Sequence, residues 1–139
     1  MFFDTHAHLD DSAFDEDREA VIASLKDYGV SRVLNASSDI ASSNRTATLC
    51  DKYDFIYGAV GVHPHDAENM KESDFDILRD LTKNEKICAI GEIGLDYYYD
   101  HSPRDIQKKR FEEQLHLARE LKLPVIIHDR DAHEDSLNI

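Results

Sequence analysis

The chain has 139 residues, of which 41% are hydrophobic and 32% are charged, and this composition excludes a disordered, fibrous or membrane-spanning class of protein. Sixteen basic residues stand against 29 acidic ones, and the resulting net charge of −13 opposes a diffuse, counterion-releasing grip on nucleic acid. If a polyanion binds, the attraction must be local, and bound divalent metal ions could supply it.

Targeting and membrane features are missing from the sequence. The first residues lack the charged and apolar regions of a signal peptide, and no apolar run approaches the roughly 20 residues that a membrane span needs. We therefore expect a cytoplasmic protein without a membrane partner. Cys50 and Cys88 follow no metal-binding or redox spacing, so we expect both thiols to stay reduced.

Short apolar runs alternate with longer amphipathic stretches along the chain, which is typical of βα units around a parallel sheet. Most of the runs are continuously apolar, as expected for strands that are buried on both faces. In chain order, the predicted strands are Phe2 to Thr5, Arg32 to Ala36, Phe55 to Val62, Ile87 to Ile90 and Pro124 to His128.

Helical periodicity and start signals predict a helix after most of these strands. The first carries apolar residues from Phe14 to Tyr28, with Ser12 and Asp15 as a capping box and Gly29 as its stop. The others are Asp39 to Lys52, a helix capped by Ser73, a long helix opened by Ser102-Pro103, and the start of one at Ala132 to Ile139. Residues 1–139 thus form a single domain with four complete βα units and part of a fifth.

Residues of metal-ligand type gather at the ends of the predicted strands. His6 and His8 follow the first strand at a spacing that puts both imidazoles on one face. Glu92 follows the fourth strand, and His128 ends the fifth. Active sites of parallel α/β proteins, and of barrels in particular, lie at this carboxyl face.

Two strand-end histidines on their own would most simply be polar groups with satisfied hydrogen bonds. Four ligand-type residues at three separate strand ends favour metal binding instead. Imidazole suits zinc, and a shared carboxylate also admits manganese or magnesium, so the choice among Zn, Mn and Mg stays open.

Four ordered motifs resemble those of the TatD deoxyribonucleases, over essentially the whole chain. They are Phe3-Asp4-Thr5-His6-Ala7-His8-Leu9-Asp10, Gly61-Val62-His63-Pro64-His65, Gly91-Glu92-Ile93-Gly94-Leu95-Asp96-Tyr97 and Pro124-Val125-Ile126-Ile127-His128. The resemblance implies an α/β fold, the (β/α)8 TIM barrel of metal-dependent hydrolases, and 3′ to 5′ exonuclease action on the ends or single strands of DNA.

The same resemblance implies a role for each matching residue. His6 and His8 would hold one divalent metal ion, Glu92 would bridge two, and His128 would hold the second. Arg130 resembles a phosphate contact, and His63 resembles an active-site histidine that contacts the scissile phosphate or protonates the leaving oxygen. A pair of metal ions roughly 3.5–4 Å apart would supply the hydroxide and the counter-charge that phosphodiester hydrolysis needs.

The chain departs from the family in length. A complete barrel needs about 250 residues, so three strands are missing, together with the histidine and aspartate ligands that the family carries on later strands. We expect either a truncated piece of a longer protein or two copies that self-associate to close a barrel. A small-molecule ester, lactone or amide hydrolase, or a non-catalytic metal-binding fragment, remains an alternative function.

Overall fold

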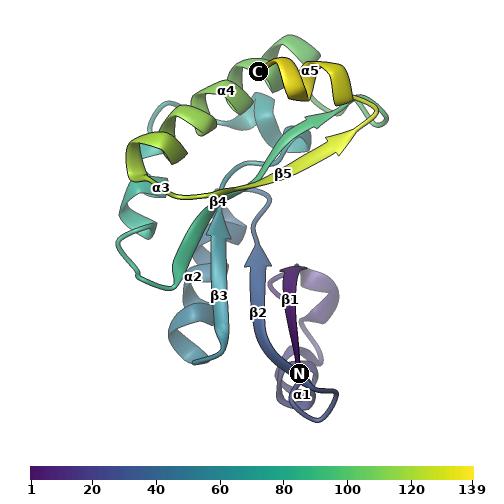
Figure 1. The fold of residues 1–139 in the computed structure, drawn as a ribbon, viewed down its shortest axis with the longest axis vertical. Helices are drawn as coiled ribbons and strands as arrows, with labels where there is room; N and C mark the ends of the chain where they lie inside the picture. The colour runs from purple at the N-terminus through teal and green to yellow at the C-terminus, as the bar shows by residue number, and fades with distance from the viewer.

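The computed structural model describes residues 1–139, and it contains one parallel sheet whose five strands lie in chain order (Figure 1). The strands are β1 Phe2–Ala7, β2 Val30–Ala36, β3 Ile56–Val60, β4 Ile87–Asp96 and β5 Val125–Arg130. Each strand pairs in parallel with the one before it, so every connection crosses over the sheet. The sheet is curled, and the predicted part of a TIM barrel is confirmed as a half-barrel.

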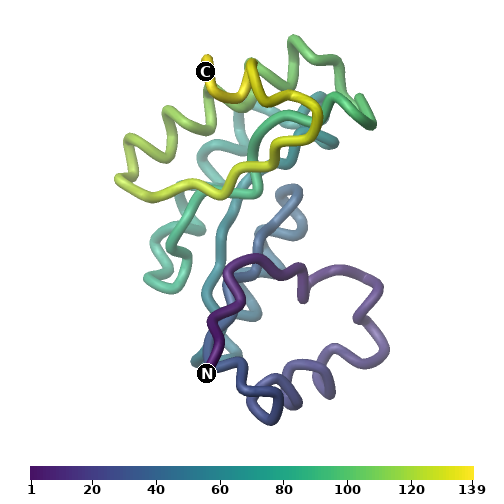
Figure 2. Tube along the Cα trace, turned by 45° about the vertical axis from the view of Figure 1, so that its right-hand side comes forward, coloured from purple at the N-terminus to yellow at the C-terminus, as the bar shows by residue number.

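Helices follow the strands. They are the 3-10 helices η1 Ser12–Phe14 and η2 Pro64–Asn69 and the α-helices α1 Arg18–Ser24, α2 Ile40–Lys52, α3 Asp74–Leu81, α4 Arg104–Leu121 and α5 His133–Asn138. The two longest, α2 and α4, pack on β3 and β4 respectively. The chain ends lie at opposite ends of the long axis (Figures 1 and 2).

The first helix differs from its prediction. Ser12 does not cap a helix that runs on to Tyr28; Asp11 accepts the hydrogen bond of the Ala13 amide and caps the short η1. The Arg18 guanidinium, at the start of α1, donates to carbonyl oxygens of the loop before η1, and residues 15–17 separate η1 from α1. α1 ends at Ser24, so Tyr28, which is 78% exposed, lies beyond the helix and Gly29 is not its stop. With a φ of +80°, Gly29 ends the turn that follows α1.

The other predicted helix starts lie close to the observed ones. Asp39 caps α2 with a reciprocal hydrogen bond to Ser42, and Pro103 precedes α4 as predicted. Ser73 occupies the cap position of α3, but its side chain makes no capping hydrogen bond. The loop predicted after the third strand contains η2, with Pro64 as its first residue.

The fourth strand is longer than predicted, and this changes the position of Glu92. The strand does not end at Ile90, and Glu92 lies inside β4 instead of after it. Pairing with β5 resumes beyond an irregularity, with Ile93 opposite Ile127 and Gly94 opposite His128. The two glycines of this segment suggest a loop in the sequence, whereas in the fold they admit the neighbouring strand.

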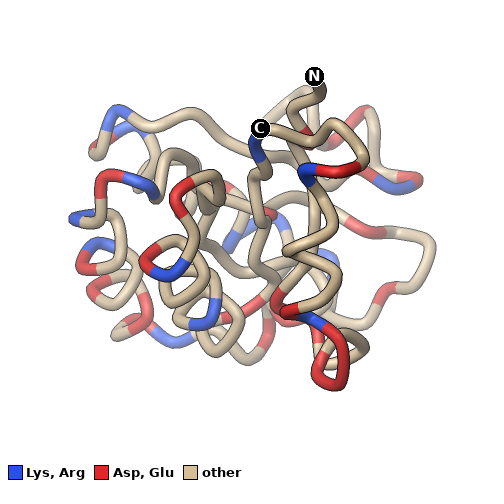
Figure 3. Tube along the Cα trace, turned by 90° about the horizontal axis from the view of Figure 1, so that it is seen from below, with Lys and Arg blue, Asp and Glu red and all other residues tan.

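The core lies between the convex face of the sheet and the helices, and includes Ile22, Val33, Ile56, Leu78, Ile90, Ile93, Leu95 and Phe111. The two outer strands each have one neighbour, and Phe3 on β1 and Ile127 on β5 are 52% and 48% exposed. Acidic and basic residues are interspersed along the outer helices (Figure 3). None of these helices has both the length and the apolar character that crossing a membrane requires.

Candidate metal centre

The ligand-type residues predicted from the sequence meet at the carboxyl end of the sheet. β1 and β4 are not neighbours in the strand order, yet the His6 Nε2 atom lies 3.1 Å from Glu92 Oε2. On the other side, His128 Nδ1 on β5 lies 2.9 Å from Glu92 Oε1. The Glu92 carboxylate is therefore held between two groups of histidines, one facing each oxygen.

His6, His8 and Glu92 form the first group, in which one ligand atom from each residue lies within 4.8 Å of the others. His8 Nδ1 lies 2.8 Å from the Ala36 carbonyl oxygen, to which it donates, so its Nε2 keeps a free lone pair. That Nε2 is 3.6 Å from Glu92 Oε2. Two imidazoles and a carboxylate oxygen are a donor set that fits a divalent metal ion.

His128 is held by carboxylates at both ring nitrogens. Besides Glu92, it contacts Asp96 through Nε2 at 2.9 Å, and the hydrogen bond to Glu92 is the main reason that the pKa of His128 is raised. Burial opposes ionisation of Glu92, but the hydrogen bond from His128 and the neighbouring imidazoles lower the pKa of that carboxyl to about 2. Glu92 is therefore an anion, as a metal ligand must be.

Asp96 is a fully buried carboxylate that sequence analysis did not assign to the site. Its Oδ2 accepts from His65 Nε2 at 2.8 Å as well as from His128, and its Oδ1 accepts from the Tyr98 and Tyr99 amides. Burial opposes ionisation, yet these hydrogen bonds hold the pKa of Asp96 well below its usual range. The contacts reach residues more than 30 positions away, so only the fold brings them together.

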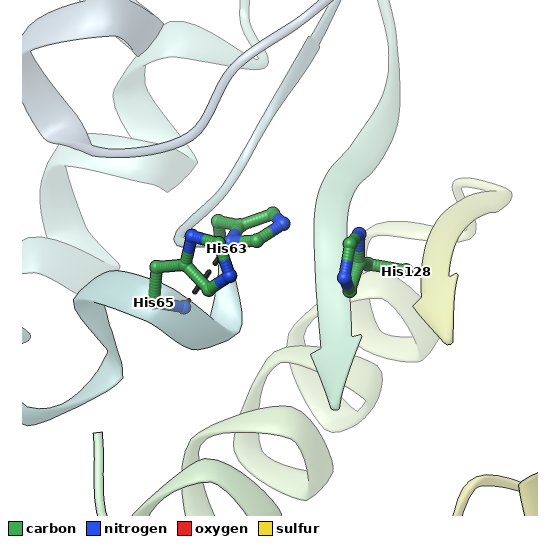
Figure 4. Close-up of side chains that lie close together, drawn as sticks. All are labelled: His63, His65 and His128. Atoms are coloured by element: carbon green, nitrogen blue, oxygen red, sulfur yellow. Dashed lines mark hydrogen bonds between the residues drawn. The ribbon is translucent and has the colours of Figure 1, made fainter. Parts of the chain in front are cut away.

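A second histidine group surrounds His128. Figure 4 shows the imidazoles of His63 and His65, at the start of η2, turned toward that of His128. The ring centroids of His63 and His128 are 4.2 Å apart, and those of His63 and His65 are 4.3 Å apart. Burial and the positive charge of His128 lower the pKa of His63 to about 3, so this imidazole is neutral at neutral pH.

The tautomer of His63 follows from its backbone contact. Its Nδ1 accepts from the His65 amide at 3.1 Å, so the proton is on Nε2, which is left as a donor. The loop after β2 places both sides of the site, because the Ser37 carbonyl accepts from the Glu92 amide and the Ser38 carbonyl accepts from the His63 amide. Both of these backbone bonds are 2.8 Å long.

Two glycines allow β4 to carry Glu92 close to β5. Gly94 has a φ of +143°, and a Cβ atom there would lie 2.0 Å from the His128 carbonyl oxygen. A Cβ atom on Gly91 would lie 2.7 Å from that of Ile126. The Gly-Glu-Ile-Gly motif is thus a requirement of strand packing at the site.

Arg130, the last residue of β5, lies outside the histidine groups. Because it is two residues beyond His128 on the strand, its side chain leaves the same face. Its guanidinium carbon lies 4.4 Å and 4.8 Å from the ring centroids of Tyr98 and Tyr99. All six predicted site residues are therefore at one end of the sheet, with three histidines around the Glu92 carboxylate and with His63 and Arg130 beside them.

Comparison with known proteins gives a consistent set of relatives. A family model described as "TatD related DNase" matches residues 3–139. The whole chain is 48% identical to "Uncharacterized metal-dependent hydrolase YabD" of Bacillus subtilis, of which it covers 54%. It is 34% identical over 132 residues to the "3'-5' ssDNA/RNA exonuclease TatD" of Escherichia coli, a match that covers 95% of this chain and 51% of that protein.

Solved structures agree in fold. The TatD homologue YJJV of Escherichia coli superposes with a TM-score of 0.88 at 32% identity, covering 97% of this chain and 53% of that one. A TatD family hydrolase of Entamoeba histolytica gives a TM-score of 0.90 at 25% identity, covering 99% and 52%. The chain spans about half the length of the relatives it matches.

Proposed function

Because the chain belongs to the family of TatD-related deoxyribonucleases, we propose that it carries one half of a divalent-metal-dependent 3′ to 5′ exonuclease site that acts on DNA ends or single strands. The observation that supports this most is the division of the Glu92 carboxylate, with one oxygen facing His6 and His8 and the other facing His128. A bridging carboxylate between two histidine groups is the arrangement that a two-metal hydrolase needs.

In this proposal His6 and His8 would hold one divalent ion, His128 would hold a second, and Glu92 would be shared by the two. Ions bound there, whether zinc, manganese or magnesium, would supply an activated water and positive charge beside the non-bridging phosphate oxygens. Asp96 keeps its hydrogen bond to His128 Nε2 and so fixes the ring that presents Nδ1.

The other two site residues act on the substrate. Neutral His63 donates through Nε2, which suits a hydrogen bond to a phosphate oxygen better than protonation of the leaving group. Arg130 adds a local positive charge for the phosphate, which the protein's overall charge of −13 does not provide. Residues 1–139 would form part of one barrel domain, whose remaining metal ligands come from further strands or from a second copy.

Release of nucleotides from a 3′-labelled single-stranded oligonucleotide, with manganese or magnesium, tests the proposal. We expect metal-dependent release that the Glu92→Ala variant loses, and we expect metal content to fall more in Glu92→Ala than in His63→Ala. Equal metal in the two variants by elemental analysis would contradict the assigned roles. A chain that binds metal but releases no nucleotide would refute exonuclease activity for these 139 residues.

Two alternatives are distinguished by simple observations. The second candidate is a small-molecule hydrolase, since one relative is named only as a metal-dependent hydrolase, with no substrate in its name. Hydrolysis of esters, lactones or amides without action on oligonucleotides would establish it. Since the chain spans about half of its relatives, a non-catalytic fragment is the third. A folded monomer that binds no metal would support that one.

A further inference from the structure

An exposed group of aromatic and cationic side chains lies beside the metal centre, and the proposed chemistry does not use its rings. Tyr98 and Tyr99, directly after β4, are 60% and 48% exposed. The Arg130 guanidinium at the end of β5 covers part of both rings, which meet edge to face at a centroid distance of 4.7 Å. We call Tyr98, Tyr99 and Arg130 the aromatic platform.

Hydrogen bonds from the Asp96 and Arg104 side chains fix the turn that carries the aromatic platform. Asp96 Oδ1 accepts from the Tyr98 amide at 3.1 Å and from the Tyr99 amide at 2.8 Å. Arg104 donates to the Tyr97 carbonyl and pairs with Asp100 on the far side of the turn. The rings are therefore held in place without being buried, and a ligand that stacks on them would have little ordering to impose.

Tyr97, the residue before Tyr98, has contacts that packing explains. It is half-buried, its hydroxyl donates to Asp135 at 2.6 Å, and Arg104 covers its ring. Tyr98, by contrast, makes no side-chain hydrogen bond and keeps most of its surface in solvent. Packing explains Tyr97 but leaves the exposure of Tyr98 without a structural reason.

Arg130 has no acidic partner. Nearby cations such as Arg104 and Lys108 pair with Asp100 and Asp135, whereas no carboxylate lies within ion-pair distance of Arg130. In a chain with 29 acidic residues, an unpaired guanidinium resting on two rings is available for an anion. A phosphate next to a stacked base would provide that anion.

The platform is continuous with the metal centre through a series of ring contacts. The Tyr99 ring lies 5.5 Å from that of His65, which lies 4.3 Å from that of His63. His63 in turn contacts His128, the ligand beside Glu92. These rings therefore offer one continuous path from the metal centre to the platform for a nucleotide chain whose phosphate lies at Glu92.

We propose that Tyr98, supported by Arg130, is a nucleobase-stacking subsite for single-stranded nucleic acid, and this proposal rests on the function proposed above. Every base has a π-face, so the subsite accepts bases of any sequence. It requires an unstacked base and therefore favours a single strand over a duplex. Arg130 contacts the phosphate adjoining that base.

Binding in the metal-free protein, with EDTA present, separates this subsite from cleavage. The probes are a short dye-labelled oligothymidine and the same backbone with abasic positions, and the readout is fluorescence anisotropy. We expect Tyr98→Ala to weaken oligothymidine binding roughly 5- to 150-fold, with Tyr98→Phe retaining it. The control is Tyr28→Ala. Tyr28 is 78% exposed and precedes β2, at the end of that strand away from the metal centre, so this change should leave binding unchanged.

The abasic probe tests whether the lost affinity comes from the base. It should bind the wild-type chain more weakly than oligothymidine does, and it should not distinguish wild type from Tyr98→Ala. The sequence has six tyrosines and no tryptophan, so stacking should also quench the tyrosine emission, and Tyr98→Phe should lose part of that quenching while keeping its affinity. This second readout does not depend on how the alanine variant folds.

The subsite is overturned if wild type and Tyr98→Ala bind oligothymidine equally, if the abasic probe binds wild type as well as oligothymidine, or if neither probe binds. The proposed exonuclease is judged separately, by release of nucleotides with metal present. Base-dependent binding without release would support the subsite and count against the nuclease. Release with unchanged Tyr98→Ala affinity would support the nuclease and refute the subsite.

Discussion

Replacing Asp96 with asparagine should weaken both the fold and the metal centre, because its carboxylate accepts hydrogen bonds from four donors. Oδ2 accepts from His65 and His128, and Oδ1 accepts from the Tyr98 and Tyr99 amides, at distances of 2.8 to 3.1 Å. An asparagine amide has only one acceptor atom. If its NH2 group faces the Tyr98 and Tyr99 amides, these two donors lose their acceptor. If it faces His65 and His128, each ring must give up its Nε2 proton to accept from it, and His128 then carries its proton on Nδ1.

The magnitude follows from the burial of this group. Asp96 is fully buried but its donors are only part-buried, so each lost hydrogen bond costs about 0.5–1.5 kcal/mol, and losing the two amide bonds costs about 1–3 kcal/mol of folding free energy. Against a typical total of about 5–15 kcal/mol, this is a large change. If the amide faces His128, the ring loses its orienting acceptor, and we expect metal affinity to fall roughly 10- to 100-fold.

Two assays measure these effects. Urea unfolding in EDTA, followed by far-ultraviolet circular dichroism, gives the stability of wild type and Asp96→Asn, and calorimetric titration gives the metal affinity. Asp100→Asn is the matched control, because that carboxylate lies in the same turn but is exposed and pairs only with Arg104. If Asp96→Asn unfolds at the wild-type urea concentration and binds metal unchanged, the positioning role of Asp96 is refuted.

Three further changes test other parts of the structure. Gly94→Ala should destabilise the chain by roughly 3 kcal/mol or more in urea unfolding, because its Cβ would clash with the His128 carbonyl. Gly29→Ala, whose Cβ would make only ordinary van der Waals contact with the Phe2 ring, should cost about 1 kcal/mol, and equal effects would contradict the packing argument. Burial raises the pKa of the Cys50 thiol to about 12, against an ordinary value of about 8.5. In mildly alkaline buffer this thiol should therefore stay protonated and resist alkylation until urea is added, which peptide mass mapping would measure. The unpaired edges and the exposed Ile127 should make the 139-residue chain self-associate with rising concentration in light scattering, and Ile127→Lys should shift it toward monomer; a wild-type chain that stays monomeric throughout would count against this.

The sequence predicts the architecture well because continuous apolar runs and helix-start residues are local signals. The strands and α2, α3 and α4 lie close to where periodicity places them, and so do the histidines at the strand ends. The extent of β4 could not be predicted from such local signals. Gly91 and Gly94 suggest a loop, and only the partner strand β5 shows why the chain continues extended through them.

Asp96 was missed for the same reason. It lies within a quoted motif, but its residue type does not distinguish it from the solvated carboxylates of this acidic chain, and its histidine partners lie 31 and 32 positions away. The prediction of the first helix was wrong because hydrogen bonds from the Arg18 side chain to the loop before η1 outweigh a plausible capping pattern. Local propensity does not report such long-range polar contacts.

The contact between His6 and Glu92 links the first strand to the fourth across a sheet in which the two are separated by β2 and β3. Strands that far apart meet at one end only if the sheet is bent, so an ion held by both residues would bind the bent sheet and not a flatter one. Ligand binding of this kind adds stability by mass action, about 2.7 kcal/mol at a concentration one hundred times Kd. Under the proposed metal binding, the curvature of the sheet would be thermodynamically linked to the supply of metal, and a chelator would act on the shape of the protein as well as on its chemistry.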